Sequence, residues 1–151
     1  MAEAQVPDVI TLSLPSRLEL LAVLDRVTAA VCERMGFDDD ATSQTVMSVI
    51  EAGTNAVQHG HKRDPGKRFE VHFAVHPDRL EVRVHDGGKG FDVRNLNSDV
   101  TSPDHLLDMR GRGIFIMRAC CDTVDFEFGP TGTVCHLVKY RSASPQRVAD
   151  A

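Results

Sequence analysis

The chain has 151 residues, of which 42% are hydrophobic and 26% are charged, and its formal net charge is −5. This length accommodates one domain with a full hydrophobic core, and no apolar run approaches the roughly 18 residues that a membrane span needs. Because Lys and Arg form no basic stripe, direct binding to nucleic acid is not expected. The acidic N-terminus lacks the pattern of a signal peptide, so we expect a cytoplasmic protein with small-molecule and protein partners.

The first elements along the chain are expected to be a strand and a helix. A β-prone stretch covers 9–14 and is closed by a proline. Ser16 and Glu19 have the spacing of a capping box, which predicts that a helix starts there. Leucine and valine residues recur at helical spacing after this point, and Gly36 suits the end of the helix.

A second helix and a hairpin are expected to follow. The aspartates at 38–40 favour a helix start, and an apolar face continues to about Gly60. Residues 61–67 then have the composition of a loop. Hydrophobic and polar residues alternate over 69–75 and again over 80–84, which predicts two antiparallel strands with one face exposed to water.

In the C-terminal part, the sequence pattern predicts a mobile segment, a third helix and a second hairpin. Residues 92–110 are polar and weakly patterned, with a short helical piece expected near 105–109. The third helix is expected to begin near Gly113. Strands are predicted over 124–128 and 134–140, joined by a glycine-rich turn.

These elements predict one domain over residues 9–141, with flexible termini at 1–8 and 142–151. Helices that alternate with antiparallel strand pairs indicate an α+β fold. We expect a two-layer sandwich with a mixed, mostly antiparallel sheet of four or five strands, covered on one face by helices.

The first candidate site residue is Asp86, at the end of the second predicted strand. Residues two apart in a strand share a face, so Asp86 should point toward the helices with Val82 and Val84. A buried carboxylate needs a hydrogen-bond donor, and the exocyclic amino group of adenine is a suitable one. Gly88 and Gly90 follow and would let the backbone approach a flat ligand. The alternative is a tight bend with a surface aspartate.

Two further motifs could complete a nucleotide site. Glu51 and Asn55 are four residues apart on the second predicted helix and face the same place, where an amide oxygen can bind Mg²⁺ and a carboxylate can accept a proton. The alternative for this pair is an exposed helix surface. Free N–H groups at a helix start can bind phosphate, and the candidates are Arg110, Gly111, Arg112 and Gly113. The alternative there is a glycine hinge.

Thr133 keeps phase with Cys135 and Leu137 on the last predicted strand and could form a hydrogen bond near Asp86. The sequence has no phosphate-binding P-loop signature. The motifs G-K-G-F and R-G-R-G-I also do not extend to the glycine pattern of a Rossmann dinucleotide site.

Taken in order, the segments E-A-G-T-N-A-V-Q-H-G, D-G-G-K-G-F, R-G-R-G-I-F-I-M-R and G-T-V resemble the N box, the G1 box, the G2 box and the terminal threonine of the GHKL (Bergerat-fold) ATPases. Within that superfamily the chain is similar to the RsbW-like anti-sigma-factor serine/threonine kinases of bacterial partner-switching systems. The resemblance extends from about Val9 to Arg141. It implies an ATP site with Mg²⁺ in a two-layer Bergerat fold.

The resemblance also implies a role for each matching residue. Glu51 matches the general base, Asn55 the Mg²⁺ ligand, Asp86 the aspartate that reads adenine, and Thr133 the threonine beside it. Gly88, Gly90, Gly111 and Gly113 match the glycines of the nucleotide loops. The segment 92–110 matches the ATP lid.

By resemblance, the expected function is phosphorylation of a STAS-domain anti-anti-sigma protein by a homodimer that also sequesters a sigma factor. The chain has no room for the phosphoacceptor hairpin of sensor histidine kinases or for the transducer domain of the gyrase type. Two alternatives remain at this point. One is a nucleotide-dependent binding regulator with little or no kinase turnover, and the other is simple ATP hydrolysis with Glu51 activating water.

Overall fold

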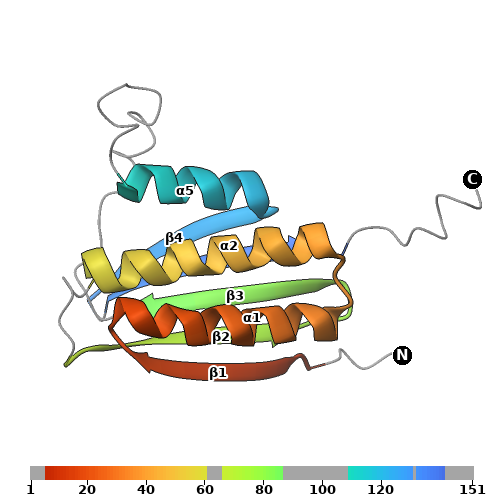
Figure 1. Ribbon diagram of the computed structural model, residues 1–151, viewed down its shortest axis with the longest axis horizontal. Helices are drawn as coiled ribbons and strands as arrows, with labels where there is room; N and C mark the ends of the chain where they lie inside the picture. Colours follow the sequence, from red (N-terminus) through yellow and green to blue (C-terminus); the bar gives the residue numbers. More distant parts are fainter. Residues whose placement is uncertain (1–5, 61–65, 87–108, 131, 142–151) are drawn as a thin grey trace, which may run out of the picture.

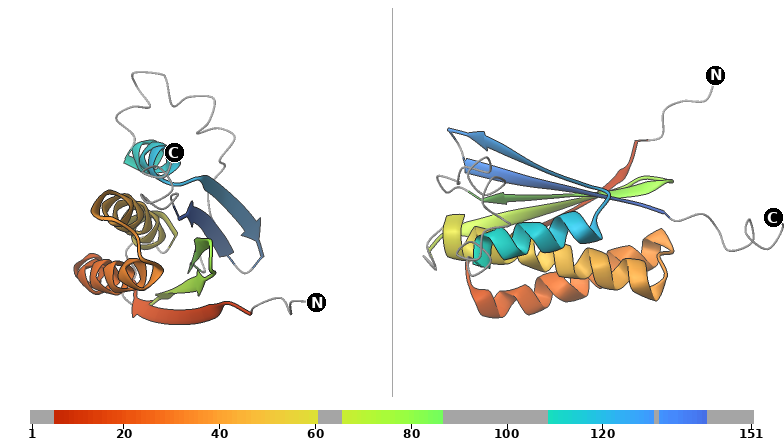
Figure 2. Two further views of the ribbon diagram at one scale, coloured as in Figure 1. Left: turned by 90° about the vertical axis from the view of Figure 1, so that its right-hand side faces the viewer. Right: turned by 90° about the horizontal axis from the view of Figure 1, so that it is seen from above.

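The structure is a computed structural model that describes residues 6–60, 66–86, 109–130 and 132–141. In this part of the chain, three α-helices lie side by side over one face of a β-sheet (Figure 1). The view from above in Figure 2 separates the molecule into a helical layer and a sheet layer. The expected α+β sandwich of two layers is therefore confirmed.

The helices and strands have the following bounds. The strands are β1 (Asp8–Pro15), β2 (Arg68–Val75), β3 (Arg79–Asp86), β4 (Thr123–Gly129) and β5 (Gly132–Tyr140). The helical elements are the 3₁₀ turn η1 (Leu18–Leu20), α1 (Leu21–Met35), α2 (Asp39–Asn55), the π-helical turn η2 (Ala56–Gly60) and α5 (Met109–Cys120). None of the helices within the described ranges is both long and apolar enough to span a membrane.

The sheet has five strands in the order β1-β2-β3-β5-β4. Every neighbouring pair of these strands is antiparallel, so the described sheet has no parallel pair and is not mixed. The central strand β3 pairs with β2 on one side and with β5 on the other. The end of β3 therefore lies in the middle of the sheet edge, between the start of β2 and the start of β5.

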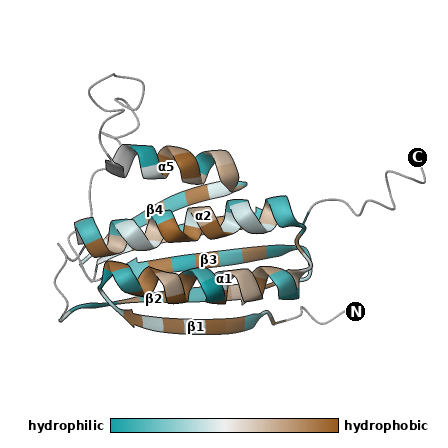
Figure 3. Ribbon diagram, in the orientation of Figure 1, coloured by the Kyte–Doolittle hydropathy of each residue, from teal (hydrophilic) through white to brown (hydrophobic). Residues whose placement is uncertain are grey.

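The hydrophobic core lies between the two layers. Alternate residues of β2 and β3 are buried, as the sequence pattern predicts, and they form one core cluster with buried residues of the helices. Figure 3 shows hydrophobic positions in both layers. The helices themselves approach closely. A Cβ atom added to Gly53 of α2 would lie 2.9 Å from the Cδ2 atoms of both Leu21 and Leu24 of α1. Gly53 thus lets α1 and α2 pack without a side chain between them.

The start of the first helix differs from the expected capping box. The chain forms the 3₁₀ turn η1 before α1, and neither the N-cap residue Arg17 of η1 nor the N-cap residue Leu20 of α1 makes a side-chain capping bond. Ser16 is buried, and its backbone N–H donates to the carbonyl of Lys67 at 2.8 Å. Ser16 therefore ties the end of β1 to the segment before β2. The predicted end at Gly36 is confirmed, since this residue has φ 74°.

The second helix begins where the sequence predicts. Asp38 is its N-cap and accepts a hydrogen bond from the backbone N–H of Ala41 at 2.8 Å. Asp39 and Asp40 lie in the first turn, where a negative charge interacts favourably with the helix dipole. The α-helix ends at Asn55, and η2 continues the helical path to Gly60.

The third helix begins earlier than expected. It starts at Met109 rather than near Gly113, because the glycine-containing stretch packs as a helix against α2 instead of opening one. Most of the helical piece predicted near 105–109, and most of the mobile segment predicted over 92–110, lie outside the described residues.

Candidate nucleotide site

Asp86 occupies the last position of the central strand β3. Its side chain follows the buried residues Leu80, Val82 and Val84 on the inner face of the sheet, and the residue is only 8% exposed. Asp86 therefore points toward the helical layer, as the alternation predicts, rather than into bulk water. Burial raises the pKa of the Cys135 thiol on β5, and the nearby charge of Asp86 contributes to that rise.

Thr133 is the cross-strand neighbour of Asp86. The two residues are register partners between β3 and β5, and such partners have Cβ atoms about 5 Å apart. Thr133 is 4% exposed, and its Oγ1 has no hydrogen-bond partner among the described residues. A buried hydroxyl without a partner costs about 1–3 kcal/mol, so this atom marks a place where a ligand could supply the missing bond.

Glu51 and Asn55 lie one turn apart at the C-terminal end of α2 and face Gly113 of α5. A Cβ atom added to Gly113 would lie 2.8 Å from Oε2 of Glu51, and 3.7 and 3.8 Å from Nδ2 and Oδ1 of Asn55. The helical spacing that the sequence shows therefore brings both side chains to one place. The absence of a side chain at Gly113 leaves room for the Glu51 carboxylate.

Asn55 is 7% exposed, and its Nδ2 makes no hydrogen bond within the described part of the chain. A side-chain amide can present either its oxygen or its nitrogen by a half-turn, so Asn55 can offer an oxygen ligand to a cation. The turn η2, which follows Asn55 directly, contacts β3. Figure 1 shows that α2 and β3 end at the same side of the sandwich, so Asn55 and Asp86 lie at the same side.

The Glu51 carboxyl is partly desolvated. Burial raises its pKa above the ordinary value of 4.5, and the positive charge of Arg112 acts in the opposite direction. Sequence reasoning assigned Arg112 to phosphate binding and missed this second effect on Glu51. The signal that could have found it is the position of Arg112 next to Gly113, once the contact between α2 and α5 is known.

The remaining predicted site residues are only partly described. Arg112 is exposed on α5, and Gly113 is buried. Arg110 and Gly111 lie in α5, but the structure describes only their helical backbone. Gly88 and Gly90 lie outside the described residues. Because α5 begins at Met109, Gly113 lies within the helix, and its close approach to Glu51 is the role that its position supports.

Comparison with known sequences relates this arrangement to one family. The profile of the histidine kinase-like ATPase domain matches residues 14–139. The chain is 33% identical over 136 residues to the serine-protein kinase RsbW of Bacillus cereus, covering 87% of this chain and 84% of that protein. It is 32% identical over 138 residues to the serine-protein kinase RsbW of Bacillus subtilis, covering 88% of this chain and 86% of that protein.

Solved structures share the fold at lower sequence identity. A crystal structure of the RsbU and RsbW domains of a Mycobacterium tuberculosis protein aligns with a TM-score of 0.63 and 18% identity, over 90% of this chain and 33% of that chain. The histidine kinase domain of a blue-light-activated histidine kinase from Erythrobacter litoralis aligns with a TM-score of 0.52 and 21% identity, over 99% of this chain and 70% of that chain. The protein thus belongs to the histidine kinase-like ATPase domain family and, within it, to the RsbW-like serine-protein kinases.

Proposed function

We propose that this protein binds ATP with Mg²⁺ and transfers the γ-phosphate to a serine or threonine of a STAS-domain anti-anti-sigma protein. The proposal includes a second role, in which the chain holds a sigma factor inactive as an anti-sigma factor. It rests on membership of a family whose relatives are named serine-protein kinases and on the inward carboxylate of Asp86.

The observation that carries the ATP site is the pairing of Asp86 with Thr133. Both residues are buried at the middle of the sheet edge, and the Thr133 hydroxyl has no hydrogen-bond partner in the described ranges. The Asp86 carboxylate can accept a hydrogen bond from the amino group of adenine. Guanine carries a carbonyl oxygen at the equivalent place and would set acceptor against acceptor, so the site should select ATP over GTP.

Asn55 is the proposed ligand for the metal ion. Its buried amide has an unpartnered nitrogen in the described part of the chain and lies beside Glu51 and Gly113, so the residues present are compatible with a small hard cation that takes oxygen ligands. When bound, Mg²⁺ neutralises charge on the phosphate oxygens during transfer. Asn55 fixes where that charge is held.

Glu51 is the proposed base. Its carboxylate can accept the proton of the incoming hydroxyl, and partial burial raises its pKa and so strengthens it as an acceptor. Arg112 opposes that rise and favours the ionised form that a base requires. Arg110, Gly111 and Arg112 are proposed to bind the phosphates at the start of α5, and Gly88 and Gly90 are proposed to contribute to nucleotide binding.

The decisive experiment combines calorimetry with a transfer assay. The acceptor is a STAS-domain anti-anti-sigma protein from the same organism, and the nucleotide is ATP labelled at the γ-phosphate. Glu51→Ala should bind ATP with Mg²⁺ normally and transfer no label. The matched control is Glu127→Ala, which removes an exposed carboxylate on the face of the sheet that points away from the helices. This variant should retain transfer.

Two outcomes would contradict the proposal. Failure of the wild-type chain to bind ATP in the presence of Mg²⁺ removes the nucleotide site. Full label transfer by Glu51→Ala removes Glu51 from the chemistry. Binding of ATP and of the acceptor without transfer by the wild-type chain would instead identify a nucleotide-dependent binding regulator.

The proposal extends to a cytoplasmic homodimer, the state that the family resemblance implies. Sedimentation equilibrium of the purified chain, with and without ATP, tests the dimer directly. A monomer at all concentrations would refute this part and leave the kinase assignment standing.

A further inference from the structure

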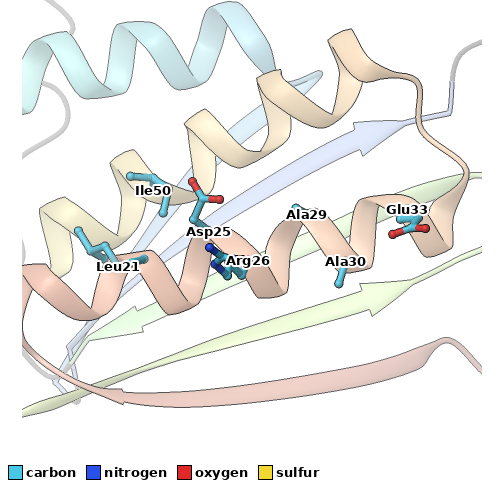
Figure 4. Close-up of a pocket in the computed structure, with 8 residues that line it drawn as sticks. Leu21, Asp25, Arg26, Ala29, Ala30, Glu33 and Ile50 are labelled. Atoms are coloured by element: carbon cyan, nitrogen blue, oxygen red, sulfur yellow. The ribbon is translucent and has the colours of Figure 1, made fainter.

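A groove runs along the outer face of the helical layer, between α1 and α2. It encloses about 740 Å³ and is lined by small and apolar side chains together with the charged residues Asp25, Arg26 and Glu33. In Figure 4 the Asp25 carboxylate extends from α1 toward α2, and Ile50 projects from α2 on the other side of the groove. This groove lies on the side of the helices that faces away from the sheet.

A second hollow of about 460 Å³ continues the groove toward the proposed base. The two share Asp25 and Ile50 in their linings, and the second also contains Met47 and Glu51. The combined surface, which we call the α1–α2 trough, therefore extends from Glu33 to Glu51. Met47 is 48% exposed, a large apolar side chain available to a partner on this surface.

We propose that the α1–α2 trough seats the segment of the protein substrate that carries the acceptor hydroxyl. The inference rests on the proposed kinase function and adds to it the path by which the substrate reaches Glu51. Glu51 contacts two regions: its carboxylate faces Gly113 and Asn55, and the residue also lines the trough. A hydroxyl that arrives along the trough reaches the proposed base without crossing the sheet edge, where Asp86 and Thr133 hold the nucleotide.

The proposed transfer is an in-line displacement. The hydroxyl oxygen forms the new bond to the γ-phosphorus, and the bond from that phosphorus to the β,γ-bridging oxygen breaks, leaving its electron pair on ADP. The hydroxyl proton passes to Glu51. In-line geometry needs the acceptor and the leaving ADP on opposite sides of the phosphorus.

The charges of the trough define the chemistry of its occupant. The trough is lined by three acidic residues, Asp25, Glu33 and Glu51, and by one basic residue, Arg26. Within the described residues, neither Asp25 nor Glu33 forms an ion pair. Met47 and Ile50 offer an apolar contact, and a methionine adapts to several side-chain shapes. The expected occupant is a segment with a serine or threonine, an apolar residue and at least one lysine or arginine. An acidic segment would be repelled.

The test compares charge reversal in the trough with charge reversal elsewhere. Asp25→Arg should raise the KM for the STAS-domain acceptor about tenfold, the effect expected when a favourable charge contact becomes repulsive. Binding of ATP, measured by calorimetry, should stay unchanged. Glu127→Arg makes the same charge change on the opposite face of the sheet and should leave the KM unchanged.

A second variant guards against a simple folding defect. Met47→Ala removes the exposed apolar contact without adding charge and should raise the KM for the same acceptor, while thermal melting and ATP affinity remain at their wild-type values. Reversing a lysine or arginine near the acceptor serine to glutamate should restore binding to Asp25→Arg. That rescue is not expected from a structural role of Asp25.

The outcomes separate this inference from the proposed function. If the wild-type chain neither binds nor phosphorylates the acceptor, the kinase proposal and the trough assignment both fail. If the wild-type chain transfers phosphate and both trough variants have the KM of the control, the trough assignment alone is overturned. The same holds if Asp25→Arg dissociates a dimer without changing the KM, because the occupant is then a second copy of this chain.

Discussion

Two rows of side chains cross the inner face of the sheet, and they differ in the polarity of their residues. Phe73, Val82 and Leu137 form the apolar row in the middle of β2, β3 and β5, and each is at most 2% exposed. The second row, at the edge of the same strands, contains Phe69, Asp86 and Thr133 and is also buried. We call it the polar row because Asp86 and Thr133 are polar.

The strands and the face are the same in both rows, so the fold does not require polar residues in either. The Thr133 hydroxyl is buried and has no partner in the part of the chain that the structure describes, so it lowers stability unless a ligand bonds to it. The comparison therefore separates residues that hold the fold together from the residues that we propose for nucleotide binding.

The largest expected effect comes from breaking the apolar row. Phe73→Ala should lower the free energy of unfolding by about 3–5 kcal/mol, since it removes a fully buried ring from the core. Denaturant unfolding measures the loss. The control Phe115→Ala, at a ring that is 62% exposed on α5, should change stability by less than about 1 kcal/mol. Equal losses for both variants would contradict the burial difference.

The next effect comes from the polar row. Asp86→Asn should weaken ATP binding by about ten- to a hundredfold, since it removes a charged hydrogen-bond acceptor. The preference for ATP over GTP should also decrease, because an amide can donate to the guanine carbonyl. Calorimetry with both nucleotides measures the change, and Asp125→Asn on the exposed face of β4 is the control. Unchanged ATP affinity would remove Asp86 from the site.

Replacing Thr133 should raise stability slightly, in contrast to the loss expected for Phe73→Ala. Thr133→Val keeps the shape of the side chain and removes a buried hydroxyl that has no partner among the described residues, so the ligand-free protein should gain about 1 kcal/mol. ATP affinity should fall about fivefold at the same time. Melting curves and calorimetry test the two changes, with Thr123→Val at an exposed position as the control. A loss of stability would indicate that the hydroxyl is satisfied inside the protein.

The smallest effect concerns Glu51. Its pKa is raised in the folded state, so its charge lowers stability once the pH rises through the folded pKa, and this cost is absent below 4.5, where the carboxyl is protonated in both states. Glu51→Gln should therefore raise the melting temperature slightly at pH 7, and the gain should disappear in acid. Melting curves across this range, with Glu127→Gln as the control, measure it. A gain that persists in acid would point to packing rather than charge.

The parts of the site that follow from local rules could be predicted from the sequence. Strand alternation alone places Asp86 and Thr133 on the inner face, and both are buried there. Helical spacing alone places Glu51 and Asn55 on one side of α2, and both lie close to Gly113. These features depend only on the periods of the strand and the helix, which the sequence determines directly.

The parts that depend on contacts between distant segments could not be predicted. The sequence predicts a helix start near Gly113, but α5 packs against α2 and already begins at Met109. Ser16 has the spacing of a capping residue and instead joins the end of β1 to Lys67. The α1–α2 trough depends on how two helices pack, which no local pattern specifies.

The position of Asp86 at the end of the central strand has a consequence for amide hydrogen exchange. β3 is hydrogen-bonded to neighbours on both sides along its length, so its amides should exchange only when the whole sheet opens. A nucleotide bound at the proposed site should stabilise the protein against that global opening. Its binding should therefore slow exchange along the whole of β3, and not only around the nucleotide.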